Sequence, residues 1–277
     1  MKWLFVLFLA IIIFGGAAWF GYNYVFKEDI QVAKEQRGET TPEPRIDLSL
    51  PEFEAAAKLR QEGKIPEARA ALAAFVQRYP SSPSADAAKD LLGEVNIGIF
   101  LSRTPSPEKE EYIVKPGDVI NKVARKTKTT PELIMRMNNM SGIMLHIGER
   151  LLISHPDFAI VVQRKQNLLT LLNHGGFFKQ YHIRELKVPA KAAKVTTKVA
   201  QVMAWRDGKQ VGFGTKEFIG STRWIRLASQ SYTIYAVPDS AHQVVQTPPP
   251  QGIGLAAADV EELGSLVNNK TPVTITD

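Results

Sequence analysis

Polar segments that contain proline divide this chain into parts whose hydrophobic patterns differ. Residues 27–50 include the stretch "GETTPEPR", and residues 99–111 include "SRTPSPEKEE". Because such stretches lack the apolar side chains of a core, we expect both segments to be linkers. The 277 residues are enough for two or three domains. The patterns of the remaining parts predict a multidomain protein of the α+β class.

Residues 1–26 carry one early lysine and then an apolar run from Trp3 to Phe26 without a charge. At about 1.5 Å per helical residue, this run is long enough to cross a hydrocarbon core of roughly 30 Å. The pattern favours an uncleaved transmembrane helix. A cleaved signal peptide is the alternative, because Gly16-Ala17-Ala18 offers small residues at a cleavage site. In both cases we expect the bulk of the chain outside the cytoplasm.

Residues 51–98 have apolar side chains at helical spacing and predict a short α-helical hairpin followed by a third helix that begins at Ala85. Gly63 ends the first helix, and Pro66 suits the first turn of the next. The segment resembles a tetratricopeptide-type hairpin through the following residues: Gly63-Lys64, Ala68, Tyr79-Pro80 and Ala88. It covers only about one and a half repeats, whereas such arrays usually need three. We therefore expect a spacer or dimerisation element, with a protein partner bound by these helices as the alternative.

Residues 112–154 form a small pattern of strand, helix, helix and strand. Tyr112-Ile113-Val114 is prone to β structure, and Asp118, after a turn, is placed to cap a helix. Thr130-Pro131-Glu132 is a strong start for a second helix, and Leu151–Ile153 supplies the returning strand. The residues expected to face inward are Ile120, Val123, Ala124, Leu133, Ile134 and Met137.

The same residues resemble a LysM domain in register over the whole segment. The matching positions are Tyr112, Val114 to Asp118, Ala124, Pro131-Glu132-Leu133, Asn138, Ile147-Gly148 and Leu151. The resemblance implies a shallow groove for chains that contain N-acetylglucosamine, as in peptidoglycan or chitin. The implied glycan-binding residues lie in two loops: Gly117, Asp118, Val119, Ile120, Asn138, Asn139, Met140 and Ile143. The family often has threonine where this chain has Val119, and a single module should bind weakly because its contact surface is shallow.

Residues 157–277 are dominated by strand signals. Three strands are expected between Phe158 and His182, with turns at residues 164–167 and 173–176. Asp207-Gly208 is a favoured dipeptide for a tight hairpin turn. Two short strands follow, then a helix over residues 259–266 and a closing strand at "TPVTI".

This region resembles the mostly-β catalytic domain of L,D-transpeptidases, best at its end, "IGLAAADVEELGSLVNNKTPVTI". The family uses a cysteine thiolate, activated by a histidine, to attack a peptide carbonyl. Its Ser-His-Gly-Cys-x-Arg signature aligns with residues 249–254, which puts Pro250 in place of histidine, Gly252 in place of cysteine and Gly254 in place of arginine. Its upstream Ile-His-Gly becomes Ile234-Tyr235-Ala236.

The chain contains no cysteine, which excludes disulfides, thiolate metal sites and thiol catalysis. Glycine cannot attack a carbonyl and proline cannot accept a proton. Ser240 and His242 are close in sequence, but an extended segment does not by itself bring them into contact. The five histidines have no metal-ligand spacing. We expect no catalytic residues, no metal and no cofactor.

The formal net charge of +6 suits an anionic polymer such as a cell wall, although a mildly basic soluble surface is the alternative. No nucleic-acid motif is present, so nucleic acid is not expected as a partner. The sequence thus predicts a membrane-anchored, extracytoplasmic peptidoglycan-binding protein of the bacterial cell envelope with a catalytically dead transpeptidase-like domain. Two alternatives stay open: an active wall-peptide transferase or hydrolase without cysteine, and an envelope scaffold that uses its helices.

Overall fold

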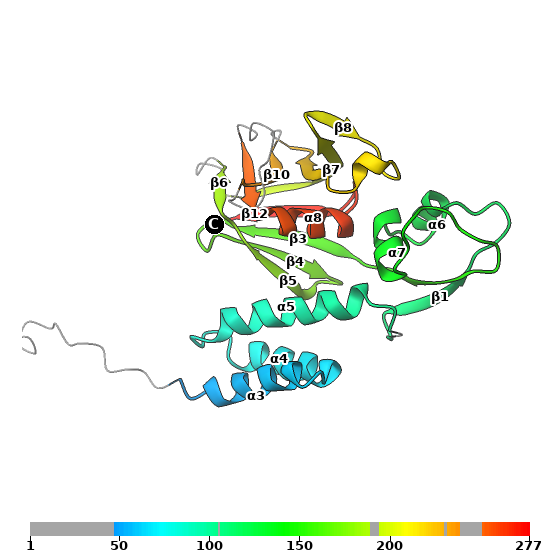
Figure 1. Ribbon diagram of the computed structural model, residues 1–277. Helices are drawn as coiled ribbons and strands as arrows, with labels where there is room; N and C mark the ends of the chain where they lie inside the picture. Colours follow the sequence, from blue (N-terminus) through cyan, green and yellow to red (C-terminus); the bar gives the residue numbers. More distant parts are fainter. Residues whose placement is uncertain (1–46, 105, 189–193, 230–231, 239–250) are drawn as a thin grey trace, which may run out of the picture. The chain divides into compact units, whose positions relative to one another are not determined.

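The computed structural model (Figure 1) describes residues 47–104, 106–188, 194–229, 232–238 and 251–277. The predicted membrane segment 1–26 and nearly all of the linker 27–50 lie outside these ranges. Within them, no helix is long and apolar enough to cross a membrane. Residues 49–277 belong to one compact unit that contains both helices and strands, which confirms the α+β class.

The first helices of the described chain are α3 (Leu50–Gln61), α4 (Ile65–Arg78) and α5 (Ala85–Leu101). Both α3 and α4 have a proline in their first turn, where a missing N–H costs nothing. Gly63 adopts φ +74° between them, a backbone angle that favours glycine. The three helices share a small core made of Ala56, Leu72, Phe75, Ala88, Leu92 and Val95.

Strands β1 (Lys109–Ile113) and β2 (Arg150–Ser154) pair antiparallel, and α6 (Ile120–Lys126) and α7 (Pro131–Met137) lie between them in the chain. The predicted order of strand, helix, helix and strand is therefore confirmed. Because β1 begins at Lys109 and α5 ends at Leu101, the connection between them is short. All six residues predicted to face inward are buried, but in two different cores. Ile120, Val123, Ala124 and Ile134 form one hydrophobic cluster with Val114, Leu151 and Ile153, whereas Leu133 and Met137 belong to the core of the sheet.

Two predicted helix caps have different outcomes. Thr130 caps α7 as predicted, because its hydroxyl accepts a 3.0 Å hydrogen bond from the Leu133 N–H. The prediction that Asp118 caps α6 is wrong. Val119 occupies the cap position without a side-chain bond, and the Asp118 carboxylate instead accepts from Tyr112. The turn before α6 directs this carboxylate back to the first strand.

A ten-stranded sheet makes up most of the remaining chain, in the order β5-β4-β3-β12-β7-β9-β10-β11-β6, with β8 paired to β7. The pairs β3–β12 and β10–β11 are parallel, and the other pairs are antiparallel. The strands are β3 (Phe158–Gln163), β4 (Leu168–Asn173), β5 (Gly176–His182), β6 (Glu185–Lys187), β7 (Val195–Arg206), β8 (Lys209–Val211), β9 (Thr222–Leu227), β10 (Thr233–Ala236), β11 (Gly252–Leu255) and β12 (Pro272–Thr276).

The strands and turns predicted from short stretches of sequence are present in this sheet. The three strands up to His182 and their two turns are present, and buried residues alternate along β3. Asp207 and Gly208 both have positive φ, as a two-residue hairpin turn between β7 and β8 requires. Helix α8 (Ala257–Leu266) packs on β9 and β10, and a short 3₁₀ helix, η2 (Lys216–Phe218), follows β8.

Helix α5 lies directly against β5, so the helical segment is physically joined to the sheet (Figure 1). A Cβ atom at Gly93 would lie 2.8 Å from the Cγ of Lys179, a distance that only glycine avoids without a shift. The Asn96 amide donates a buried 2.8 Å hydrogen bond to the Phe178 carbonyl. The ring of Phe100 packs edge-on against that of Phe178. This helix therefore shares the core of the sheet.

Candidate functional site

The two loops expected to bind glycan present five of their eight predicted residues at or near the surface. Gly117 is exposed with φ +78°, and the Val119 side chain beside it is 59% exposed. On the other loop Asn139 is exposed with φ +52°, Ile143 is 45% exposed and Met140 is half-buried. Apolar side chains that remain in water on loops are typical of an interaction surface.

The other three residues support the loops from within. Ile120 is buried in the same hydrophobic cluster against which Met140 packs, so both loops are attached to one core. Asn138 donates both amide protons, at 2.8 Å each, to the carbonyls of Ile134 and Leu152. Its amide oxygen accepts from the Leu152 N–H at 2.8 Å. These two side chains hold the loop rather than face outward.

The third supporting residue, Asp118, fixes the turn that carries Gly117. Its carboxylate accepts from the Tyr112 hydroxyl at 2.7 Å and from the Lys115 N–H at 2.9 Å. Both bonds lower the pKa of Asp118, and the bond from Tyr112 is the larger cause. The bond between Tyr112 and Asp118 also raises the pKa of Tyr112. The Lys126 ammonium lies 5.3 Å from the centre of the Tyr112 ring. The conformation of the first loop is therefore tied to strand β1.

Two exposed apolar residues near the second loop were missed in the sequence. Met144 is 74% exposed and Ile147 is 72% exposed. The run "GIMLHIG" contains four large apolar residues where no strand or helix was predicted, and that pattern could have indicated a surface for contact.

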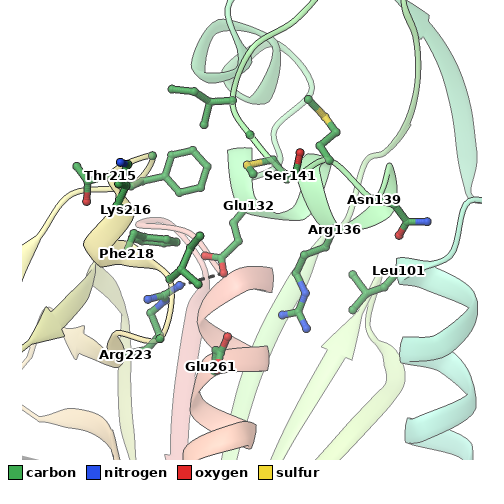
Figure 2. A pocket seen from close by; sticks show the side chains of 18 residues that line it. Leu101, Glu132, Arg136, Asn139, Ser141, Thr215, Lys216, Phe218, Arg223 and Glu261 are labelled. Atoms are coloured by element: carbon green, nitrogen blue, oxygen red, sulfur yellow. Dashed lines mark hydrogen bonds and ion pairs between the residues drawn. The ribbon is translucent and has the colours of Figure 1, made fainter.

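A cleft of about 840 Å³ begins at the second loop and continues to the C-terminal sheet (Figure 2). Its first wall consists of residues from α7 and from the loop Asn139–Ile143. Its second wall consists of the segment Phe213–Gly220, except Glu217, together with Arg223 from β9 and Glu261 from α8. Both polar and apolar side chains line it.

The strands that correspond to the transpeptidase signature lie side by side. β10 and β11 pair in parallel with Ile234 opposite Ile253 and Tyr235 opposite Gly254. A Cβ atom at Gly252 would lie 2.0 Å from the carbonyl oxygen of Thr233. At Gly254 a Cβ atom would lie 2.4 Å from a methyl group of Val237. The strand therefore has no room for a side chain at residue 252 without a shift of the backbone.

Tyr235, which replaces the upstream histidine, is buried and donates a 2.7 Å hydrogen bond to Glu185 on β6. Burial, followed by this bond, raises the pKa of Tyr235 well above its ordinary value, so the hydroxyl stays protonated at neutral pH. Glu185 also pairs with Lys187 at 2.7 Å, and the lysine bond is the main cause that lowers the pKa of Glu185. This network consists of mutually satisfied groups.

Other candidates for chemistry lie elsewhere or outside the described residues. Pro249, Pro250, Ser240 and His242 fall in the undescribed range 239–250. Among the described residues, no group of three histidine, aspartate or glutamate side chains is arranged to hold a metal ion. His155 contacts Glu110 at 2.8 Å.

The comparison with protein families matches residues 112–154 to the model described as "LysM domain". Residues 112–154 are therefore a LysM domain, as the sequence predicts. No curated protein sequence matches the chain.

Among solved structures, the chain is similar to L,D-transpeptidases. A mutant enzyme from Enterococcus faecium has 13% identity and a TM-score of 0.30, over 44% of this chain and 52% of that chain. The enzyme from Mycobacterium smegmatis has 10% identity and a TM-score of 0.31, over 48% and 65%. One from Mycobacterium tuberculosis H37Rv has 11% identity and a TM-score of 0.31, over 48% and 75%. The match thus spans about half to two thirds of the first two chains. The tetratricopeptide resemblance stays a prediction.

Proposed function

We propose that this chain is a peptidoglycan-binding protein of the bacterial cell envelope. Residues 1–26 anchor it in the membrane, and the rest of the chain lies outside the cytoplasm. The LysM domain binds glycan that contains N-acetylglucosamine. The transpeptidase-like domain is catalytically dead and has a binding or structural role.

The observation that carries the binding part of this proposal is the surface of the LysM loops. Val119 and Ile143 offer exposed apolar contact, and Gly117 leaves backbone groups accessible in a turn that Asp118 holds in place. Backbone N–H and C=O groups complement the N-acetyl groups of a sugar chain, while apolar side chains cover the sugar faces. A binding surface of this kind needs no catalytic group.

Two independent facts support the proposal that the transpeptidase-like domain has no catalytic activity. The whole chain has no cysteine, so no thiolate can form. At Gly252, in addition, the strand has closed so far that a side chain would overlap the Thr233 carbonyl. The hydroxyl of Tyr235 is bound to Glu185 and has a raised pKa, which opposes a role as base.

A sedimentation assay with insoluble peptidoglycan tests the binding function on the full chain. We expect retention of the wild type and reduced retention of Val119→Asp, which places a negative charge on the first glycan loop at a cap position that favours aspartate. The matched control is Leu50→Asp at the start of α3, far from the LysM loops in sequence. A wild type that stays in the supernatant would overturn the proposal.

Incubation of the same protein with wall peptides, followed by mass analysis, tests the catalytic part. We expect no new cross-links and no trimmed peptides. Either product would establish the alternative of a transferase or hydrolase without cysteine. Protease treatment of spheroplasts, with cleavage of residues 49–277 expected, tests the proposed localisation.

A groove of about 640 Å³ beside α4 and α5 favours a second function, that of an envelope scaffold. It is lined by apolar residues such as Ile65, Val95 and Ile99, with Gly98 at its surface. A side chain at Gly98 meets nothing within 4 Å, so Gly98→Glu covers the groove without strain. We expect this variant to fold with a stability gain of about 0.5 kcal/mol from helix propensity and to lose any partner that co-purifies. Retention of every partner would exclude the groove.

A further inference from the structure

The cleft between the LysM domain and the C-terminal sheet continues the candidate glycan site. Asn139, Met140 and Ile143 belong both to the second glycan loop and to the cleft wall. The opposite wall reaches this loop directly: a Cβ atom at Gly214 would lie 3.2 Å from the Ile143 side chain, and Phe213 packs against the LysM core. A sugar chain on the loop would therefore have its substituents at the mouth of the cleft.

The walls of the cleft are held in place by contacts across it. The Thr130 hydroxyl donates to the Ser265 carbonyl at 2.7 Å, and Arg136 donates to the Ser265 hydroxyl at 2.7 Å. Glu132 pairs with Arg223 at 3.1 Å, with both side chains largely buried (Figure 2). These contacts join α7 to α8 and β9, so the cleft is a built feature of the fold.

Arg223 also forms part of the cleft floor. Its guanidinium lies 3.8 Å from the centre of the Phe218 ring and donates to the Ser221 hydroxyl. Among the described residues, the Nε–H of Arg223 is buried without a hydrogen-bond acceptor.

The remaining charges of the cleft are mainly positive. Arg136 on α7 and the exposed Lys216 on η2 line it, and neither makes an ion pair within the described part of the chain. Glu261 is the lining carboxylate outside the Glu132–Arg223 pair, and it can accept hydrogen bonds from hydroxyl or amide groups. Two cations beside apolar walls suit a carboxylate attached to a sugar.

We propose, on the basis of the peptidoglycan-binding function above, that this cleft is a subsite for a carboxylate substituent of the bound glycan. Arg136 and Lys216 bind the carboxylate, and Phe213 and Phe218 cover the apolar part of the substituent. The subsite makes the protein prefer acidic peptidoglycan strands to neutral chitin, which has the same N-acetylglucosamine units without a carboxylate.

The test measures the affinity of the full chain for three soluble oligosaccharides of equal length. One is neutral chitin, one is peptidoglycan glycan with its peptides removed, so that the lactyl carboxylate is free, and one is the same glycan with its peptides attached. We expect the wild type to bind at least one of the acidic ligands about fivefold more tightly than chitin, as one exposed charge-assisted contact would give. We expect Lys216→Glu to remove this preference and leave chitin affinity unchanged.

Lys209→Glu is the matched control, because Lys209 is exposed on β8 and does not line the cleft. Ser265→Ala tests whether the charge of Arg136 or its bond to Ser265 matters. It removes the hydrogen bond between the Arg136 guanidinium and the Ser265 hydroxyl but keeps the positive charge, so the preference for acidic glycan should persist. A Lys216 effect confined to the stripped glycan assigns the subsite to the lactyl carboxylate, and one confined to the peptide-bearing glycan assigns it to the peptide. Equal affinity for chitin and both acidic ligands would overturn the subsite, whereas no binding of any ligand would overturn the glycan-binding function itself.

Discussion

The LysM loops and the β10–β11 strands both depart from a family pattern, but the departures have different structural consequences. Val119 stands where the LysM family often has threonine, on a loop where its side chain is 59% exposed. Gly252, which the sequence aligns with the transpeptidase cysteine, lies inside a buried strand, where the Thr233 carbonyl occupies the space that a side chain would need. A change on the loop therefore alters affinity, whereas the change in the strand has become part of the packing.

The largest expected effect comes from an attempt to restore the nucleophile. Gly252→Cys places a Cβ atom 2.0 Å from the Thr233 oxygen and should destabilise the fold by about 3 kcal/mol or more. Urea unfolding measures the loss, and intact mass after incubation with a carbapenem measures acylation, which we expect to be absent. Gly98→Cys is the control, because it adds a thiol where nothing lies within 4 Å. A stable Gly252→Cys protein that forms an adduct would show that the active site survives.

The next largest effect separates two roles within the second LysM loop: Asn138 holds the loop in place, and Asn139 is exposed for contact with the glycan. Asn138→Ala leaves the Leu152 N–H and carbonyl without their side-chain partner and removes one of the two bonds that the Ile134 carbonyl accepts, so it should cost about 2 kcal/mol of stability. Asn139→Gly keeps the positive φ and should leave stability nearly unchanged while it weakens glycan binding. Thermal unfolding and glycan titration of both variants separate the two roles. Equal stability losses would show that the two residues do not differ in this way.

The sequence predicts much of the local structure because each element carries its own signal. The turns of β3 to β5, the Asp207-Gly208 hairpin and the Thr130 cap depend on residues within a few positions of one another. The predicted Asp118 cap is wrong because its carboxylate bonds to the Tyr112 hydroxyl on β1 and not to the first turn of α6. Short-range propensity could not choose between the cap and this bond.

The sequence does not predict the cleft, because the cleft depends on contacts between residues that are far apart in the chain. The cleft brings Glu132 to Arg223, 91 positions apart, and Thr130 to Ser265, 135 positions apart. No period or motif marks such pairs. The closure at Gly252 is equally invisible in the sequence: the missing thiol could be predicted there, but the position of the Thr233 carbonyl could not.

A pH dependence tests whether the first LysM loop relies on its ionised carboxylate. Because the pKa of Asp118 is lowered in the folded state, its ionised form stabilises the fold above the ordinary aspartate pKa, and this contribution is lost as the pH falls through the folded-state pKa. We expect Asp118→Asn to be less stable than wild type at neutral pH, with the difference vanishing in acid. Urea unfolding between about pH 7 and about pH 2 measures it, because the folded-state pKa lies below the ordinary aspartate value of about 3.9. A difference that persists unchanged in acid would contradict the role of the charge.

The smallest expected effect returns to the departure on the loop surface. Val119→Thr keeps the β-branched shape at an exposed position and places a hydroxyl at the uncapped N-cap of α6, so the fold should gain at most about 1 kcal/mol of stability. The added hydroxyl can form one hydrogen bond to the glycan, which should raise affinity by at most about fivefold. Titration with a chitin oligosaccharide measures the gain, and Val119→Ala controls for lost apolar contact. If threonine restores affinity without cost to stability, the loop departure is reversible by one residue, which the closed strand at Gly252 does not permit.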